Sequence, residues 1–145
     1  MKRRWLVSVA PLVFVALLLS ACGESVSDEH VIVQPATVEE VDDGEVARVT
    51  LTDSAAERLD IQTVPVASSG KGLVVPSDAL YITAEGQFWV YTNPEPLVYV
   101  RHEVIIDRER GGQAFLSEGP KAGTEVVTIG VPELYGTETG NGSDD

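Results

Sequence analysis

Cysteine is nearly absent from this chain. Of its 145 residues only Cys22 carries a thiol, and there are one methionine and two histidines. A single cysteine excludes an internal disulfide framework, and it excludes a zinc site built on several thiolates. The role of Cys22 must therefore be sought in the residues around it.

Basic residues are also scarce. The chain has 10 Lys and Arg against 23 Asp and Glu, which gives a formal net charge of −13. Proteins that bind nucleic acid need a basic face to neutralise phosphates, so we expect no nucleic-acid partner. A length of 145 residues indicates one domain rather than two.

No arrangement of residues typical of a catalytic site is present. The sequence has no Gly-x-Ser-x-Gly motif and no glycine-rich phosphate loop. His102 has Arg101 and Glu103 beside it, but neighbours in a strand point to opposite faces. Residues 42–45, Asp-Asp-Gly-Glu, lack the alternating ligands of an EF-hand loop. We therefore expect no catalytic, cofactor-binding or metal-binding residues, and no enzyme activity.

Long hydrophobic runs are absent except at the start of the chain. Residues 2–4 are Lys-Arg-Arg, and residues 5–19 are apolar apart from Ser8. This run is shorter than the roughly 20 residues of a spanning helix, and Pro11 interrupts it. A basic start, an apolar run and small residues before a cleavage point are typical of a secretory signal. The sequence therefore predicts a signal peptide over residues 1–21.

The residues at the end of this signal explain the single thiol. Residues 19–23, Leu-Ser-Ala-Cys-Gly, resemble the bacterial lipobox, in which the cysteine is acylated and the bond before it is cut. The resemblance implies cleavage between Ala21 and Cys22 and a lipid on Cys22. An ordinary signal peptide with a chance cysteine, or an uncleaved anchor, is the alternative. We expect a protein secreted across the cytoplasmic membrane and lipid-anchored at the outer face of a membrane.

Cleavage would leave 124 residues, and the loss of three basic residues would lower the net charge to −16. Such a body is repelled by anionic headgroups and should stand off the membrane. Eight of the 24 residues from 23 to 46 are acidic, and none is basic. High charge with few large apolar side chains favours disorder, so residues 22–46 are expected to form a flexible tether. Residues 136–145 are expected to be a disordered tail.

The expected folded part covers residues 47–135 and reads as short strands. Ser54 and Glu57 have the spacing of a capping box, which predicts a short helix over residues 52–59. Pro65 places the strand that contains it at a sheet edge. The strands are expected at residues 47–51, 60–66, 73–76, 81–83, 88–91, 97–107, 113–116 and 125–129. This spacing predicts an all-β fold, a small antiparallel β-barrel or sandwich with one short helix.

The densest aromatic segment is the expected hairpin at residues 81–91. Alternation puts Phe88 and Val90 on one face of a strand, and Trp89 and Tyr91 on the other. We expect Trp89 to lie opposite residues 81–82, to be substantially buried, and to pack against Val104 or Val126. Core packing is a more common role for such a cluster than ligand binding.

Four segments carry a resemblance to a known family. They read Val-Val-Pro-Ser-Asp-Ala-Leu at 74–80, Gly-Gln-Phe-Trp-Val-Tyr at 86–91, Val-Arg-His-Glu-Val at 100–104, and a Gly-rich stretch ending Glu-Val-Val-Thr-Ile-Gly at 118–130. Their order and spacing resemble the C-terminal membrane-proximal domain of periplasmic adaptor proteins, the membrane-fusion proteins of resistance–nodulation–division efflux systems. Pro120 and Thr124 depart from that family's Leu and Asp.

The family's other domains have no counterpart here. Only residues 67–72 stand where the family has a lipoyl-like domain, a helical hairpin and a β-barrel, and no heptad pattern is present. The resemblance implies a non-catalytic β domain that binds an inner-membrane transporter or another envelope complex, in the manner of an efflux adaptor. The alternative is a free-standing surface lipoprotein with a small-molecule-binding or structural role, because a fold does not fix a function.

Overall fold

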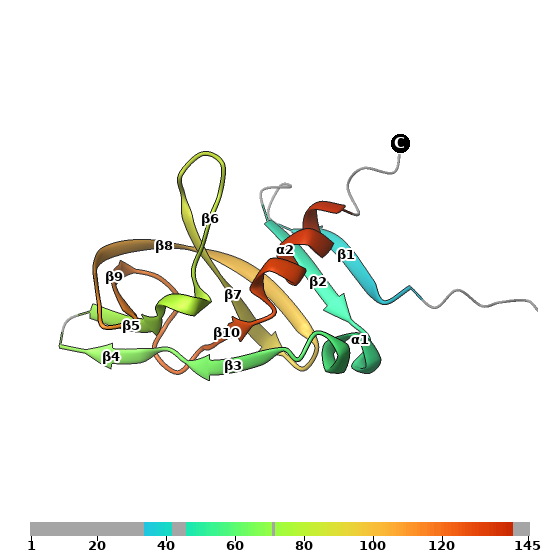
Figure 1. Ribbon diagram of the computed structural model, residues 1–145, viewed down its shortest axis with the longest axis horizontal. Helices are drawn as coiled ribbons and strands as arrows, with labels where there is room; N and C mark the ends of the chain where they lie inside the picture. The colour runs from blue at the N-terminus through green and yellow to red at the C-terminus, as the bar shows by residue number, and fades with distance from the viewer. Residues whose placement is uncertain (1–33, 42–45, 71, 141–145) are drawn as a thin grey trace, which may run out of the picture. The chain divides into compact units, whose positions relative to one another are not determined.

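The computed structural model describes residues 34–41, 46–70 and 72–140 (Figure 1). The expected signal peptide at residues 1–21, the cleavage point at Ala21, the lipidation site at Cys22 and most of the expected tether lie outside the described residues.

The described chain is mostly β, as the sequence predicted. In chain order the elements are β1 (Ala36–Val41), β2 (Val46–Leu51), α1 (Asp53–Arg58), β3 (Gln62–Pro65), β4 (Ala67–Ser69), β5 (Gly72–Pro76), the 3₁₀ turn η2 (Ser77–Ala79), β6 (Tyr81–Ile82), β7 (Phe88–Glu95), β8 (Val98–Arg110), β9 (Gln113–Glu118), β10 (Glu125–Ile129) and α2 (Val131–Gly140).

Antiparallel pairing wraps these strands into a nearly closed barrel. The strand order is β3-β10-β7-β8-β9-β5-β4, and β3 and β4 are consecutive pieces separated only by Val66. At this junction the Val66 amide donates to the Thr124 carbonyl at 2.9 Å, and the Gly123 amide donates to the Val66 carbonyl at 2.8 Å. The two ends of the order are thus parts of one segment, which confirms the small antiparallel barrel.

The core inside the barrel is formed by apolar side chains. Alternate residues of the strands point inward, as the period of two requires. The buried members are Val66, Val75, Ala79, Val90, Val104, Ala114, Leu116 and Val126, with Val64, Leu73, Leu80, Phe88 and Ile106 packed against them. Phe88 and Val90 share this inward face, as predicted from the alternation in the hairpin.

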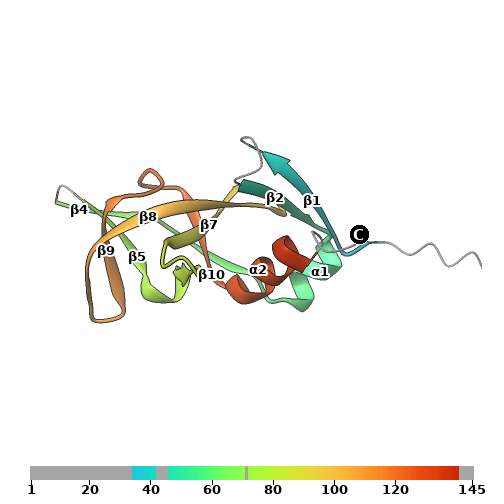
Figure 2. The same cartoon turned by 90° about the horizontal axis from the view of Figure 1, so that it is seen from above.

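A second layer covers part of the outside of the barrel (Figure 2). Strand β2 pairs with the start of β8, with Val49 opposite Tyr99, and β1 pairs with β2. Helices α1 and α2 complete this layer. Its buried members are Ala36, Val49, Leu51, Ala55, Tyr91, Tyr99, Val127, Val131 and Leu134. The barrel wall thus has an apolar core on each side, and β7 contributes to both.

Part of the predicted tether is a strand, so its boundary at residue 46 is wrong. Residues Ala36–Val41 form β1, which pairs antiparallel with Val46–Leu51. Ala36 is buried and Val38 is half-buried, whereas Glu39 and Glu40 are exposed. A two-residue alternation is therefore present in this acidic segment. The high content of acidic residues hid this alternation, because only a few small apolar residues form the buried face of the strand.

The predicted disordered tail is wrong for residues 136–140. They belong to α2, which runs from Val131 to Gly140; residues 141–145 lie outside the described part. Gly130 sends the chain from β10 into this helix with a φ of +95°, and a methyl group there would overlap the Ile61 side chain. Leu134 is fully buried and Glu138, one turn later, is held by partners on the barrel. Tertiary contacts therefore order a segment whose own composition favours coil.

The helix predicted near residues 52–59 is present as α1, but its cap is a different residue. The Thr52 hydroxyl accepts from the Ala55 amide at 3.2 Å, so Thr52 is the N-cap rather than Ser54. The Thr52 amide also donates to the Pro35 carbonyl at 3.0 Å. The same residue therefore starts α1 and fixes the approach of the chain to β1.

Candidate docking surface

The β6–β7 hairpin projects from the barrel (Figure 1). Tyr81 pairs with Trp89 and Ile82 pairs with Phe88, as the sequence predicted. In the connecting turn the Thr83 amide donates to the Gln87 carbonyl at 2.9 Å, and Gly86 adopts a φ of +86°. A glycine suits this left-handed conformation, and the turn is closed by backbone hydrogen bonds. The hairpin is thus a defined feature of the surface.

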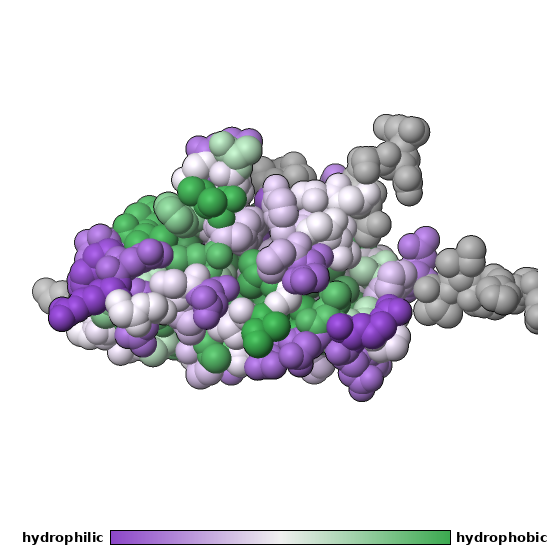
Figure 3. All heavy atoms as spheres, in the orientation of Figure 1, coloured by the Kyte–Doolittle hydropathy of each residue, from purple (hydrophilic) through white to green (hydrophobic). Residues whose placement is uncertain are grey.

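Apolar side chains are exposed where this hairpin meets α2. Ile82 is 59% exposed and Tyr135 is 38% exposed, although both are large and apolar. A hollow of about 240 Å³ lies between them; its lining residues are Asp78, Leu80, Tyr81, Ile82, Val131, Pro132 and Tyr135. We call Leu80, Tyr81, Ile82, Pro132 and Tyr135 the hairpin–helix patch. Figure 3 shows a hydrophilic hairpin tip with apolar surface below it.

The elements that form the hairpin–helix patch also carry exposed carboxylates. Asp78 lines the hollow and is exposed, and Glu85 at the hairpin tip and Glu133 on α2 are exposed as well. None of the residues that line the hollow is basic. The charged side chain among the residues that line the hollow is therefore a carboxylate, that of Asp78.

Stacked aromatic rings support the patch from below. The rings of Tyr81 and Tyr91 stack with centroids 5.4 Å apart and 15° between their planes. Tyr81 also contacts Tyr135, at 5.2 Å and 44°. Offset or tilted rings at these separations attract one another beyond the area that they bury. The hairpin and α2 are thus tied together through Tyr81.

A buried polar network fixes the end of α2 to the barrel. Glu138 accepts from the Tyr91 hydroxyl at 2.5 Å, and its other oxygen lies 3.1 Å from Arg101 Nε. The Glu138 side chain is only 6% exposed and the Arg101 side chain 21%. An ion pair held this far from water depends on good geometry, because both charges have lost most of their hydration. The network therefore specifies where α2 sits.

Burial shifts the proton affinities in this network. It raises the pKa of the Tyr91 hydroxyl well above its ordinary value, and the hydrogen bond to Glu138 raises it further. Burial also raises the pKa of Tyr81, although the neighbouring Arg101 acts in the opposite direction. For Arg101, burial lowers the pKa, but Tyr81 and the Glu138 carboxylate more than offset this effect. Both tyrosines stay neutral and Arg101 stays charged at neutral pH.

Trp89 lies beside the network and is half-buried. The Arg101 guanidinium is 4.8 Å from the centre of its ring, a cation–π contact. Its indole nitrogen is buried and makes no hydrogen bond to another described residue. The prediction that Trp89 packs against Val104 or Val126 is wrong, because both belong to the barrel interior and Trp89 shares the outer face with Tyr91.

His102 is exposed on β8, opposite Val90. Within residues 34–41, 46–70 and 72–140 no three His, Cys, Asp or Glu side chains are grouped closely enough to hold a metal ion. Over the same part of the chain, no helix is both long and apolar enough to cross a membrane.

Searches of this chain against models of protein families, curated proteins and solved structures give no match. The hairpin follows from the sequence, but the roles of Tyr135 and Glu138 were not predicted, because both lie in or at the edge of the expected tail. A signal was present: Val131, Leu134, Tyr135 and Glu138 follow the three- and four-residue spacing of one helix face.

Proposed function

We propose that this protein is a lipid-anchored, non-catalytic envelope protein whose β domain docks onto the extracytoplasmic part of a membrane transporter or another envelope complex. The observation that carries the proposal is the hairpin–helix patch, in which Ile82 is 59% exposed on a defined hairpin. Contiguous exposed apolar groups with a polar rim are typical of protein interaction sites.

The tether would keep the patch near the membrane. Gln34, the first described residue, is twelve positions after Cys22. A fully extended chain of that length spans at most about 40 Å. A lipid on Cys22 would therefore hold the domain within reach of proteins in the same membrane, which favours an integral membrane protein as the partner.

The side chains of the hairpin–helix patch indicate which kind of partner surface would be complementary to it. Its apolar members would bury an apolar projection of the partner, and the carboxylates of Asp78, Glu85 and Glu133 would face basic residues around that projection. The resemblance to periplasmic adaptors, whose membrane-proximal domain binds a transporter, supports the same kind of partner. Without the adaptor's helical hairpin, the chain would bind the transporter side only.

Two matched variants test the docking surface. The lipidated full chain is cross-linked in membranes, and the integral membrane protein bound to it is identified. Ile82→Asp should reduce its capture by about tenfold, because a carboxylate would have to be buried in the contact. Ile105→Asp is the control, since Ile105 is similarly exposed, at 49%, on β8. Equal capture by both variants would rule out the patch as the contact.

The anchor is tested separately. Cys22→Ala should abolish lipid attachment, so that the protein leaves the detergent phase on partitioning and its mature mass carries no acyl chain. A Ser20→Ala variant, which leaves the cysteine in place, serves as the control. Retention of the Cys22→Ala variant in detergent as strongly as the wild type would contradict lipidation at this residue.

A further inference from the structure

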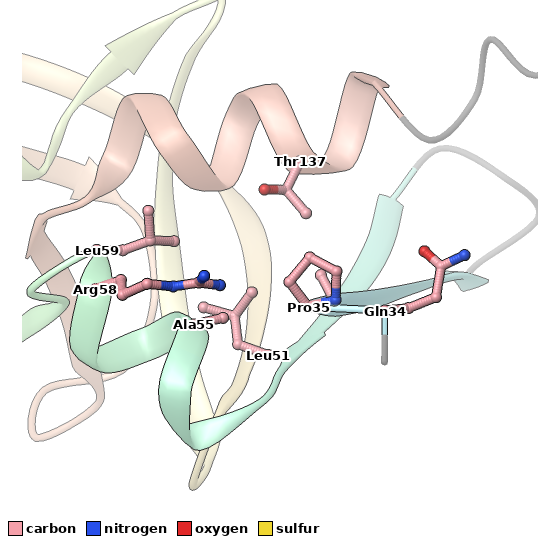
Figure 4. Close-up of a pocket in the computed structure, with 8 residues that line it drawn as sticks. Gln34, Pro35, Leu51, Ala55, Arg58, Leu59 and Thr137 are labelled. Atoms are coloured by element: carbon pink, nitrogen blue, oxygen red, sulfur yellow. The ribbon is translucent and has the colours of Figure 1, made fainter. Parts of the chain in front are cut away.

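A second hollow lies on the outer layer, away from the hairpin. It has a volume of about 310 Å³ and is bounded by Gln34, Pro35, Ala36, Leu51, Ala55, Arg58, Leu59 and Thr137 (Figure 4). These residues come from the start of β1, the end of β2, α1 and α2, and we call the hollow the α1–α2 groove. Its volume equals that of about ten water molecules.

The floor of the α1–α2 groove is apolar. Ala36, Leu51 and Ala55 belong to the buried core of the outer layer, and Leu59 packs against that core. Thr137 contributes a hydroxyl, but it already donates to the Glu133 carbonyl at 2.8 Å. Water needs two or more polar partners to be held well, and this floor offers few. The groove therefore suits an aliphatic group better than solvent.

One cation stands at the mouth of the groove. Arg58 is exposed, and in Figure 4 its side chain extends from α1 toward the other lining residues. It makes no ion pair with another residue of the described part, although acidic side chains outnumber basic ones. Gln34 is the other polar group at the rim and carries no charge. An anion can therefore reach a guanidinium here without displacing a carboxylate.

We propose that the α1–α2 groove binds an amphiphile that has an aliphatic chain and an anionic headgroup. The chain would lie on the apolar floor formed by Leu51, Ala55 and Leu59, and the headgroup would pair with Arg58. The volume fits a segment of about ten carbons. A free fatty carboxylate and the acyl chain of an anionic phospholipid share this chemistry. The site is separate from the hairpin–helix patch, so it does not depend on docking there.

Photolabelling of the full chain tests the proposal. The protein is held in nanodiscs of zwitterionic lipid and labelled with a diazirine-bearing dodecanoate, and the labelled peptides are mapped. We expect the label on α1 and on Thr137, and not on β7. Excess dodecanoate should compete with the label, whereas dodecyltrimethylammonium, which has the same chain and the opposite charge, should compete about threefold to fivefold less well.

Two pairs of variants identify the contacts. Arg58→Gln should lower labelling by about threefold to fivefold, because an exposed ion pair contributes modestly, whereas Arg110→Gln at the exposed β8–β9 turn should leave it unchanged. Gln34→Trp should fill the groove and lower labelling by about tenfold or more. Gln113→Trp, at an exposed position of β9, is its control. Equal labelling of Arg58→Gln and wild type, or equal competition by the cationic amphiphile, would overturn the proposal.

A second probe distinguishes the two sources of the chain. Phosphatidylglycerol with the diazirine on its acyl chain is placed in the disc instead of free dodecanoate. Labelling of the groove by the free acid alone identifies a soluble carboxylate, and labelling by the lipid alone identifies the bilayer. Labelling by neither probe would overturn the proposal whatever the outcome at the hairpin–helix patch.

Discussion

The two faces of the barrel wall are built from the same strands but hold different chemistry. On β7, Phe88 and Val90 point into the apolar core of the barrel interior, whereas Tyr91 points outward to the second layer. That layer contains a buried ion pair, stacked tyrosines and a groove of about 310 Å³. The proposed docking surface and the proposed amphiphile site both lie on the outer layer.

This difference shows what each core contributes. Apolar packing in the interior stabilises the barrel, but the hydrophobic effect is non-directional and does not by itself fix the position of one element against another. The Arg101–Glu138 pair contributes less to stability, because two charges lose their hydration, but it fixes the position of α2. Since α2 carries Pro132 and Tyr135, two of the five members of the hairpin–helix patch, the polar network positions that part of the candidate docking surface.

The largest expected effect on the free energy of unfolding comes from truncating a fully buried leucine, and two such leucines allow the two layers to be compared. Leu116 lies in the barrel interior at 1% exposure, and Leu134 lies in α2 at 0%. Leu116→Ala should lower the free energy of unfolding by roughly 3–5 kcal/mol, since it leaves a cavity that the closed barrel cannot fill. Leu134→Ala should lower it less, because α2 can detach while the barrel remains folded.

Chemical denaturation with amide exchange distinguishes these outcomes. In Leu116→Ala the exchange rate should rise across β7, β8 and β10, whereas in Leu134→Ala it should rise mainly in α2. Equal acceleration of the barrel strands in both variants would mean that the two layers unfold as one unit, and the distinction between them would fail.

The next effect concerns the ion pair. Glu138→Leu removes the carboxylate that pairs with Arg101 and should lower the free energy of unfolding by about 2–3 kcal/mol. This loss is smaller than the roughly 3–5 kcal/mol expected when a fully buried pair is broken, because Arg101 retains some contact with water. The double variant Arg101→Met/Glu138→Leu should recover most of this loss. Thermal unfolding of the single and double variants measures the coupling, and simple additivity would contradict it.

The sequence predicted the barrel better than its outer layer, for a physical reason. Strict alternation, as in residues 88–91, and turn residues such as Gly86 are local signals, and they specified the all-β fold and the two faces of the hairpin. The β1 strand and α2 have weak local signals: β1 is acidic, and α2 contains Gly136 and Gly140. Both are ordered by contacts with distant residues, which single-segment reasoning does not include.

The candidate sites illustrate the same limit. Tyr81 was placed correctly opposite Trp89, because hairpin register follows from a short turn. The contact of Tyr81 with Tyr135 joins residues 54 positions apart, and the contact of Tyr91 with Glu138 joins residues 47 positions apart. No local pattern specifies such pairs, so the patch and the network emerged only from the tertiary structure.

A smaller effect is expected at Trp89. Because this side chain is half-buried on the outer face, Trp89→Ala should lower the free energy of unfolding by about 1–2 kcal/mol, rather than the roughly 3–5 kcal/mol of a fully buried tryptophan. Trp89→Phe retains a ring beneath Arg101 and should stay within about 0.5 kcal/mol of the wild type. Thermal unfolding measures both, and a loss as large as that of Leu116→Ala would show that Trp89 belongs to a core.

The smallest expected effect is at the start of α1, where the outer layer begins. Thr52→Ala removes the hydroxyl that accepts from the Ala55 amide, and should lower the free energy of unfolding by about 1 kcal/mol. Ser54→Ala should change it by less than about 0.5 kcal/mol, because the hydrogen-bond partner of the Ser54 hydroxyl among the described residues is the Thr52 hydroxyl, at 3.3 Å, and not a helix amide. The Thr52 hydroxyl also donates to the Pro35 carbonyl beside the α1–α2 groove, at 3.4 Å, so amide exchange should accelerate in α1 and at the start of β1 in Thr52→Ala, and leave the barrel strands unchanged. A larger loss in Ser54→Ala would instead support the capping box expected from the sequence.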